Sequence, residues 1–312
     1  MDEFELIRTQ FAPLAPNAAG VRLGIGDDAA LLAVPADQEL VVTTDTSVAG
    51  RHFPLDTPAY DVGWKSLAVN LSDLAAMGAE PRWFTLALTL ESASLAWVQD
   101  FAAGLRDLAQ RHRVALVGGD TTRGPLSITI TAMGVVPAAR ALRRDGAKAG
   151  DAVCVTGTLG DAALALRLGA GADPALRARL DRPEPRVTAG QRLRGIAHAA
   201  IDLSDGLAGD LSHVLRASHL GARIEAERLP ASPPFLQQWQ RSGESRLALQ
   251  ARGGDDYELC LCIPPQAVDG ARASLDVPLT VIGTLTAEPG LRFVDGAGVK
   301  LDLPPHGYRH FE

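Results

Sequence analysis

Short apolar runs alternate with helical patterns through the first half of the chain. Residues 40–44, 84–90, 114–117 and 127–136 are rich in β-branched and other apolar side chains, which predicts strands. Residues 60–77 and 95–111 have the spacing of amphipathic helices. Pro58 and Gly78 stand where the first of these helices would begin and end. This alternation predicts a sheet covered by helices.

A second half of similar character follows a basic, glycine-containing connector at residues 140–150. Strands are predicted at residues 152–155, 257–263 and 279–282, and helices at residues 161–168 and 207–219. Residues 182–187, RPEPRV, predict an ordered turn that leads into a helix. Because 312 residues suffice for two hydrophobic cores, we expect a two-domain α+β chain divided at residues 1–138 and 139–312.

Charge and hydropathy exclude several classes of protein. The net charge of −7 is opposite to that of a typical nucleic-acid-binding domain. No apolar run reaches the roughly 18 residues of a membrane helix, and the N-terminus is acidic where a signal peptide would be basic. We therefore expect a cytoplasmic protein with neither nucleic acid nor membrane as a partner. Cys154, Cys260 and Cys262 lie in apolar stretches and are predicted to be buried free thiols.

The segment GIGDDA at residues 24–29 matches a dinucleotide-binding pattern formally. No strong strand precedes it, and Asp27 and Asp28 would repel a pyrophosphate. Paired carboxylates on a glycine turn suit a metal ion better.

Three further acidic segments follow apolar runs. TTDT at residues 43–46 and GGDTTRG at 118–124 stand at the ends of predicted strands, and DLSDG at 202–206 precedes a predicted helix. A turn or a helix cap explains any one of them, but together they favour a ligand site. Hydroxyl and carboxylate oxygens suit Mg²⁺, and glycine amides can approach phosphate closely. The sequence therefore predicts a magnesium and phosphate site.

Other polar residues remain open to two interpretations. Asn70 and Asp73 are three residues apart on one predicted helix face, so Asp73 either joins the site or is solvated. His52 either contacts an anionic substrate or packs in the fold. GGDDYEL at residues 253–259 is either a glycine turn or part of the site. The chain contains neither GxxxxGK[ST] nor the protein-kinase motifs, so its phosphate chemistry has another design.

The order of these motifs resembles the thiamine-monophosphate kinase family, within the superfamily of aminoimidazole ribonucleotide synthetase and selenophosphate synthetase. KSLAVNLSDLAAMGAEP at residues 65–81, VTGTLGD at 155–161 and RPEPRV at 182–187 contribute to the resemblance. It implies a two-domain PurM-like fold. Its N-terminal domain would bind ATP and Mg²⁺ and form a homodimer, and its C-terminal domain would complete the nucleotide and substrate site. It also implies phosphorylation of thiamine monophosphate to thiamine diphosphate by ATP.

The resemblance also implies roles for individual residues. The expected Mg²⁺ ligands are Asp28, Thr43, Thr44, Asp45, Asp73, Asp120, Asp202, Asp205 and, second in rank, Asp27. The expected ATP contacts are Gly119, Asp120, Arg144, Ser204 and His112, and the expected contacts to the thiamine substrate are His52, Asp255 and Tyr308. Two positions depart from the family. Asp255 replaces a glutamate that is one methylene longer, and Arg111-His112 replaces an aromatic residue near the adenine, so either side chain could stack there.

The implied reaction needs no general base, because the acceptor phosphate has a second pKa of about 6 and is largely ionised at neutral pH. Repulsion between two anionic phosphates is the obstacle, and bridging Mg²⁺ ions would reduce it. We therefore expect direct in-line transfer without a phosphoenzyme. The alternatives are a superfamily member that activates an amide or selenide with ATP, and a catalytically silent regulatory subunit.

Overall fold

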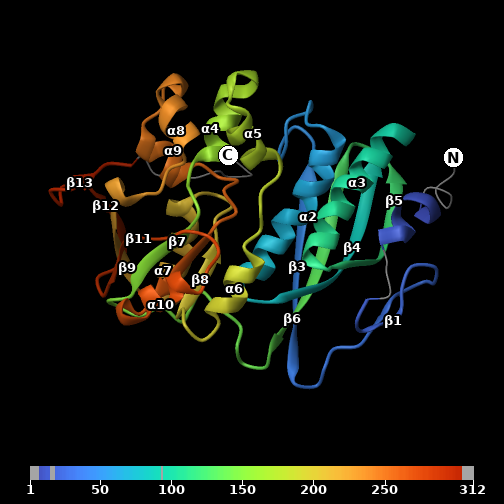
Figure 1. Cartoon of the computed structure of the whole chain (residues 1–312), viewed down its shortest axis with the longest axis horizontal. Coiled ribbons are helices and arrows are strands. Elements are labelled where there is room, and N and C mark those ends of the chain that lie inside the picture. Colours follow the sequence, from blue (N-terminus) through green and yellow to red (C-terminus); the bar gives the residue numbers. More distant parts are fainter. Residues whose placement is uncertain (1–6, 15–17, 93, 304–312) are drawn as a thin grey trace. The chain divides into compact units, whose positions relative to one another are not determined.

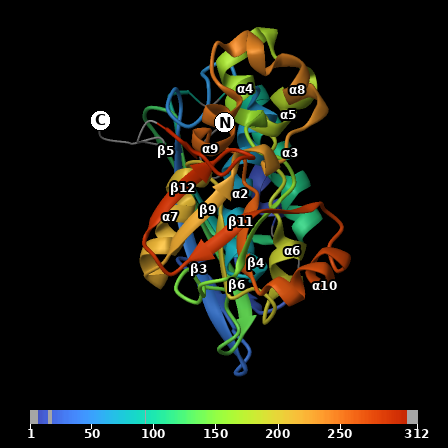
Figure 2. The same cartoon turned by 90° about the vertical axis from the view of Figure 1, so that its left-hand side faces the viewer.

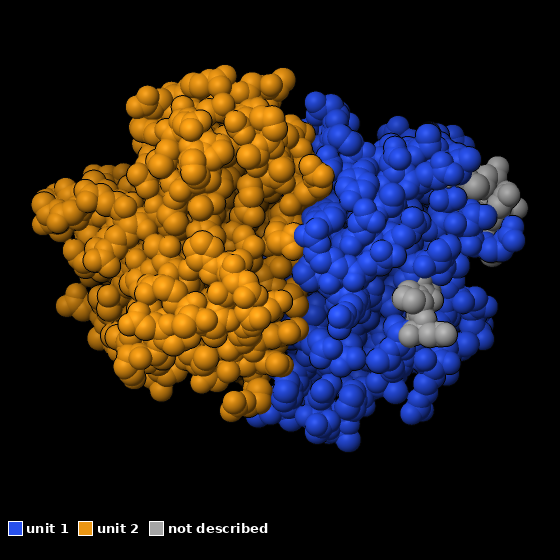
Figure 3. Space-filling view, in the orientation of Figure 1, with its two compact units in different colours: residues 1–74, 79–139 blue, residues 75–78, 140–312 orange. Residues whose placement is uncertain are grey.

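The computed structural model describes residues 7–14, 18–92 and 94–303 (Figure 1). The chain forms two compact units, coloured separately in Figure 3. Unit 1 comprises residues 1–74 and 79–139, and unit 2 comprises residues 75–78 and 140–312. The chain thus passes into the main part of unit 2 within two residues of the predicted division. The roles expected for the two domains stay predictions.

Unit 1 is built on a four-stranded sheet with the order β3-β6-β4-β5. Its strands are β3 (Gln38–Val48), β4 (Glu80–Leu90), β5 (Ala115–Arg123) and β6 (Ser127–Pro137). β6 pairs antiparallel with β3 and β4, and β4 pairs parallel with β5. N-terminal to these strands, the chain forms a π-helix, η1 (Ile7–Phe11), and a 3-10 helix, η2 (Ala12–Leu14). A two-stranded antiparallel sheet of β1 (Val21–Leu23) and β2 (Leu31–Leu32) follows.

Helices α2 (Ala59–Ala76) and α3 (Leu95–His112) cover one face of this sheet (Figure 1). Leu86 of β4 and Ile130 of β6 pair with each other and are buried on that face. The two helices cross closely, because a Cβ atom at Gly104 would lie 1.9 Å from the carbonyl oxygen of Tyr60. Glycine at this position allows the two backbones to approach.

Unit 2 is built on a seven-stranded sheet with the order β13-β12-β9-β11-β7-β10-β8. Its strands are β7 (Ala152–Thr156), β8 (Ala199–Asp202), β9 (Gly221–Glu225), β10 (Leu259–Ile263), β11 (Leu279–Thr286), β12 (Gly290–Val294) and β13 (Lys300–Leu301). Figure 2 shows β12, β9 and β11 side by side. The helices are α4 (Asp161–Leu168), α5 (Pro174–Asp181), α6 (Val187–Leu193), α7 (Leu207–Ser218), α8 (Pro233–Gln238), α9 (Arg246–Arg252) and α10 (Val268–Ala273). Short 3-10 helices lie between these strands and helices: η3 (Gly169–Gly171), η4 (Ala226–Arg228), η5 (Trp239–Ser242) and η6 (Pro265–Ala267).

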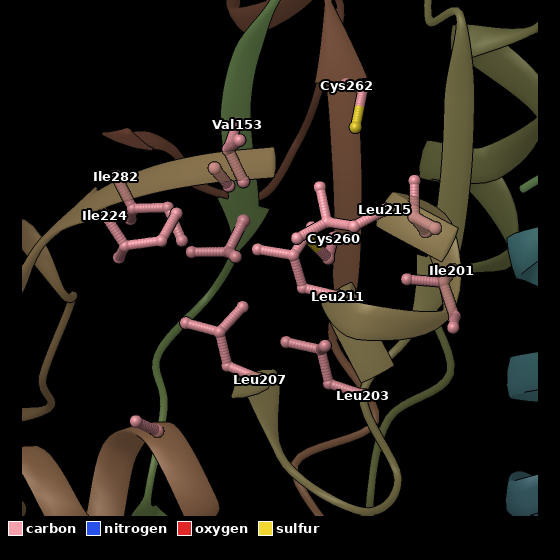
Figure 4. Packing of buried hydrophobic residues seen from close by; sticks show 14 of the residues in the cluster. Val153, Ile201, Leu203, Leu207, Leu211, Leu215, Ile224, Cys260, Cys262 and Ile282 are labelled. Carbon is pink, nitrogen blue, oxygen red and sulfur yellow. The ribbon is translucent and has the colours of Figure 1, made fainter. Parts of the chain in front are cut away.

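The core of unit 2 joins this sheet to α7 (Figure 4). Leu207, Leu211 and Leu215 follow one another at intervals of four residues, so they lie on one side of the helix. They belong to the same buried cluster as Cys260 and Ile282 of the sheet. All three cysteines are free and buried, as the sequence predicted.

The α+β prediction is confirmed, and the four predicted helices match α2, α3, α4 and α7 to within a residue. Four predicted strands were too short by four or more residues, and two of them are β4, which begins at Glu80, and β11, which continues to Thr286. β3 continues to Val48 and β5 continues to Arg123, so TTDT and all of GGDTTRG except Gly124 lie inside strands and not in loops at their ends. Both are edge strands of the sheet, where polar residues and glycine replace the apolar pattern on which the prediction depended. Among the described residues, no helix is long and apolar enough to cross a membrane.

Candidate active site

Two carboxyl groups of unit 1 lie together between β3 and α2. Thr43 donates a hydrogen bond through Oγ1 to Oδ2 of Asp73. The backbone N–H of Asp45 donates to Oδ1 of Asn70 at 3.2 Å. Burial raises the pKa of Asp45 to about 6, helped by the neighbouring charge of Asp73 and a hydrogen bond to it. A cation at this acid pair would relieve the repulsion between the two groups.

The local sequence explains this arrangement. Alternation along β3 places Thr43 and Asp45 on the face that α2 covers, because residues two apart share a side of a strand. Asn70 and Asp73 are three residues apart and share a helix face, as the sequence predicted, and the structure shows that this face contacts β3. Asn70 is fully buried, and its amide also donates to the carbonyl of Ser66 at 3.0 Å. The helix therefore holds the acid pair in a fixed place.

Thr44 and Asp120 lie on the opposite face of the same sheet. Oγ1 of Thr44 is 2.9 Å from Oγ1 of Thr131, on the face that α2 and α3 leave open. In the strand register Thr46 pairs with Thr129, and Ala87 pairs with both Thr129 and Asp120. Paired residues on neighbouring strands share a face, so Asp120 is on the open side. The side chains of Thr44 and Asp120 therefore point away from the acid pair.

Asp45 and Asp120 are also far apart across the sheet. β3 and β5 form its two edges, with β6 and β4 between them. Three strand spacings of about 4.8 Å separate the two residues by roughly 14 Å. Within one copy of unit 1, the two side chains cannot bind the same metal ion.

Asp27 and Asp28 lie exposed in the loop between β1 and β2. The backbone N–H of Asp28 donates to Oδ1 of Asp27 at 2.8 Å. This loop joins two short antiparallel strands and does not lead from a strand into a helix. The structure therefore excludes the dinucleotide-binding interpretation, as the sequence predicted.

Gly119 lies inside β5 with a backbone φ of 153°. A Cβ atom there would lie 1.9 Å from the carbonyl oxygen of Leu86 on β4. Only glycine permits this approach, so the residue is required by the sheet whether or not ATP contacts it.

Two histidines of unit 1 have defined surroundings. Nδ1 of His52 accepts a hydrogen bond from the backbone N–H of Val48 at 3.0 Å, which leaves the ring proton on Nε2 as a donor. His112 ends α3, where burial and the charge of Arg111 lower its pKa to about 4. The Arg111 guanidinium carbon lies 4.9 Å from the centre of the Trp64 ring, a cation–π distance. Of the two expected adenine contacts, Arg111 thus already lies over an aromatic ring.

In unit 2 the loop after β8 carries Asp202, Ser204 and Asp205. Asp202 is buried at the strand end, whereas Asp205 is exposed. Oδ2 of Asp210 accepts from the backbone N–H groups of Ser204 at 3.0 Å and Asp205 at 3.1 Å. Burial raises the pKa of Asp210 to about 7, and the charge of Asp205 adds to this effect. Asp210 anchors the loop from the first turn of α7, a role that no motif in the sequence indicated.

The segment 253–258 lies against this loop. The N–H of Asp255 donates to the carbonyl of Ser204 at 2.9 Å, and that of Tyr257 to the carbonyl of Leu203 at 2.8 Å. Tyr257 also donates through its hydroxyl to Oδ1 of Asp255 at 3.1 Å. The structure thus brings together Ser204 and Asp255, which were predicted to contact ATP and the thiamine substrate respectively.

Arg144, the remaining predicted ATP contact of unit 2, is exposed. Burial and the charges of Arg144 and Arg216 lower the pKa of His213, while the charge of Asp205 acts in the opposite direction. His213 therefore lies near both Arg144 and Asp205, a position for which no motif in the sequence provided a signal. Tyr308 lies outside the described residues.

The donor chemistry suits a hard cation, since Thr43, Asp45 and Asp73 offer oxygen atoms only. Within the described residues, however, three or more His, Cys, Asp or Glu side chains do not gather as they would around a metal ion. The predicted ligands are instead distributed over the two faces of one sheet and over two units.

Comparison with known families agrees with this division of the chain. Residues 26–136 match the family model of the AIR synthase related protein, N-terminal domain, and residues 148–296 match that of the C-terminal domain. The fold and the acidic segments thus define a two-domain protein of the AIR synthase related class.

Individual relatives narrow this class. Thiamine-monophosphate kinase of Escherichia coli K12 is 48% identical, over 99% of this chain and 98% of its own length. The crystal structure of thiamine-monophosphate kinase from Stenotrophomonas maltophilia K279a is also 48% identical, with a TM-score of 0.86 over 94% of this chain and 96% of its own. The structure of AaThiL complexed with AMPPCP and TMP is 29% identical, with a TM-score of 0.79 over 99% and 97% of the two chains. The chain belongs to the thiamine-monophosphate kinase family.

Proposed function

We propose that this chain transfers the γ-phosphoryl group of ATP to thiamine monophosphate and so forms thiamine diphosphate. Membership of the family supports the reaction, and the complex of AaThiL with AMPPCP and TMP supports the pair of substrates. The observation in this chain that carries the proposal is the partly buried pair of Asp45 and Asp73, two acid groups held side by side. Such a pair can bind a cation, and a cation is what two anionic phosphate groups need in order to approach each other.

Mg²⁺ is the cation we propose for this pair. When bound, it would supply positive charge to the phosphate oxygens and reduce their repulsion. Asp45, Asp73 and Thr43 would hold it, since their oxygen atoms are the donors that Mg²⁺ prefers. The other predicted ligands remain part of this proposal, with Thr44 limited to its main chain because its hydroxyl faces away.

The transfer we propose is direct and in line. The acceptor phosphate is already an oxyanion at neutral pH, so the chain needs neither a base nor a nucleophile. His52 would donate from Nε2 to an anionic group of the substrate, since Nδ1 is engaged by Val48. Incubation with γ-labelled ATP alone should leave the protein unlabelled, and a stable phosphoprotein would contradict direct transfer.

We also propose that the protein acts as a homodimer. Leu40 and Val42 of β3 are 46% and 53% exposed, an unusual exposure for apolar side chains of a strand. They share the open face of the sheet with Asp120, and both edges of that sheet are unpaired among the described residues. A second copy packed on this face would cover Leu40 and Val42. Location in the cytoplasm stays a prediction that cell fractionation would test.

The activity is tested by incubating the protein with Mg-ATP and thiamine monophosphate. Oxidation converts thiamine diphosphate to a fluorescent derivative, which chromatography separates from that of the monophosphate. We expect the diphosphate derivative to accumulate only when both substrates are present. ATP consumption that proceeds equally well without thiamine monophosphate would instead favour a superfamily member with a different acceptor.

A further inference from the structure

An ion cluster centred on the buried Glu258 lies directly after the segment that carries Asp255. Arg186 donates to both oxygens of the Glu258 carboxylate, through Nε at 2.6 Å and through Nη2 at 2.5 Å. Arg179 donates to the same carboxylate at 2.6 Å, and the Thr156 hydroxyl donates to it at 2.7 Å. Glu258 is 0% exposed. A bidentate arginine contact fixes direction as well as distance.

The cluster joins several elements of unit 2. Arg179 belongs to α5, Arg186 precedes α6, and Thr156 ends β7. Thr156 also accepts from the backbone N–H of Leu259, the first residue of β10, at 2.8 Å. The backbone N–H of Gly160 also donates a hydrogen bond to the carboxylate of the buried Asp256, and both carboxyl oxygens lie 3.0 Å from this nitrogen. The backbone from residue 256 to 259 is therefore held from several directions.

The backbone just before Glu258 has an unfavourable conformation. Asp255 and Tyr257 have φ angles of 67° and 48°, in the left-handed region that residues other than glycine rarely adopt. Such residues cost of order 1 kcal/mol each and persist only where their surroundings enforce them. The hydrogen bonds to Ser204 and Leu203 hold one side of this segment, and the Glu258 cluster holds the other.

A contribution to folding stability does not by itself explain why the fold contains such a cluster. Burying charged groups carries a large desolvation cost, and a packed apolar core of equal volume is often at least as stable. What the cluster does provide is a fixed geometry for the adjoining backbone. Asp255 is a short side chain with little reach to correct a displaced backbone, so its position depends strongly on that geometry.

We propose that Arg186 of the RPEPRV segment is a positioning residue, which acts through Glu258 to set the place of Asp255 for the thiamine substrate. This inference rests on the proposed function and on the predicted substrate contact of Asp255. It gives the RPEPRV segment a specific task in substrate binding.

The first test is Arg186→Lys, which keeps the charge but loses the two-pronged contact. We expect the KM for thiamine monophosphate to rise about tenfold, which corresponds to about 1.4 kcal/mol, and the KM for ATP to change less than about threefold. Arg167→Lys is the matched control, because Arg167 forms an exposed ion pair with Glu244 away from this cluster. It should change neither constant.

A second pair of variants covers the case in which Arg186→Lys does not fold. Thr156→Val removes one hydrogen bond to Glu258 and should raise the KM for thiamine monophosphate but not the KM for ATP. Thr156→Ser keeps the hydroxyl, so its KM for thiamine monophosphate should equal that of the wild type. If the variants lose thermal stability while the KM for thiamine monophosphate stays at its wild-type value, or if both KM values rise equally, the inference is wrong. A wild-type protein that forms no thiamine diphosphate would contradict the proposed function instead.

Discussion

At the scale of single residues, the carboxyl pair of Asp45 and Asp73 explains how a site for anionic substrates can be built from acids. The pKa of Asp45 is about 6 in the folded chain against 3.8 for an ordinary Asp. Because the folded state holds this proton more tightly than the unfolded state, folding stability decreases as the pH rises from 3.8 to about 6. Above pH 6 the pair destabilises the protein unless a cation neutralises it.

Asp45→Asn removes one of the two like charges. We expect the variant at pH 7.5 in EDTA to be more stable than the wild type by about 1–3 kcal/mol. Added Mg²⁺ should raise the unfolding temperature of the wild type but not of the variant, and turnover should fall by orders of magnitude. Thermal unfolding with EDTA and with Mg²⁺ measures this, and an equal response of both proteins to Mg²⁺ would remove Asp45 from the metal site.

The contribution of His112 to folding stability depends on pH in the opposite direction to that of Asp45. Burial and Arg111 lower its pKa from 6.5 to about 4, so the folded state binds this proton more weakly than the unfolded state. The stability from this group is complete above pH 6.5 and is lost as the pH falls toward 4. Between pH 7 and pH 5 the wild type should lose about 2 kcal/mol more than His112→Gln. Urea unfolding at the two pH values measures the difference, and parallel losses would show that His112 does not titrate in this way.

At the scale of elements, the close approach of β5 to β4 requires glycine at position 119. Gly119→Ala places a Cβ atom 1.9 Å from the carbonyl oxygen of Leu86, so the strands must separate locally. We expect a loss of about 2–4 kcal/mol in unfolding free energy and a higher KM for ATP. Gly118→Ala is the control, because its Cβ atom would lie 3.9 Å from the nearest side-chain atom of Thr85. Equal stability of the two variants would show that the strands accommodate the methyl group.

The elements also show how far the sequence could predict this fold. The helices were predicted closely, because their apolar periodicity and their end signals are local. The lengths of β3 and β5 were not, because their second halves are polar and form strands only through pairing with β6 and β4. The face on which Asp120 lies depends on that same register. The positive φ angles of Asp255 and Tyr257 likewise follow from tertiary contacts, which no local pattern reveals.

At the scale of the whole molecule, the separation of Asp45 and Asp120 allows two arrangements: separate sites within one subunit, or one site shared by the two subunits of the proposed homodimer. Asp45→Asn and Asp120→Asn should each be inactive alone. If the two residues of one site come from different subunits, random mixing of the variants should restore about a quarter of the wild-type activity, because half of the dimers are mixed and each has one intact site. The variants are unfolded and refolded together, with each variant refolded alone as the control. Mixtures that stay inactive would contradict the shared site.

Transfer of the phosphoryl group from ATP to thiamine monophosphate is tested most directly by phosphorus NMR of the reaction, which follows both products at once. With Mg²⁺ present, we predict that signals of ADP and of thiamine diphosphate grow in equal amounts, without free phosphate. Growth of ADP and free phosphate while thiamine monophosphate stays unchanged would contradict the account.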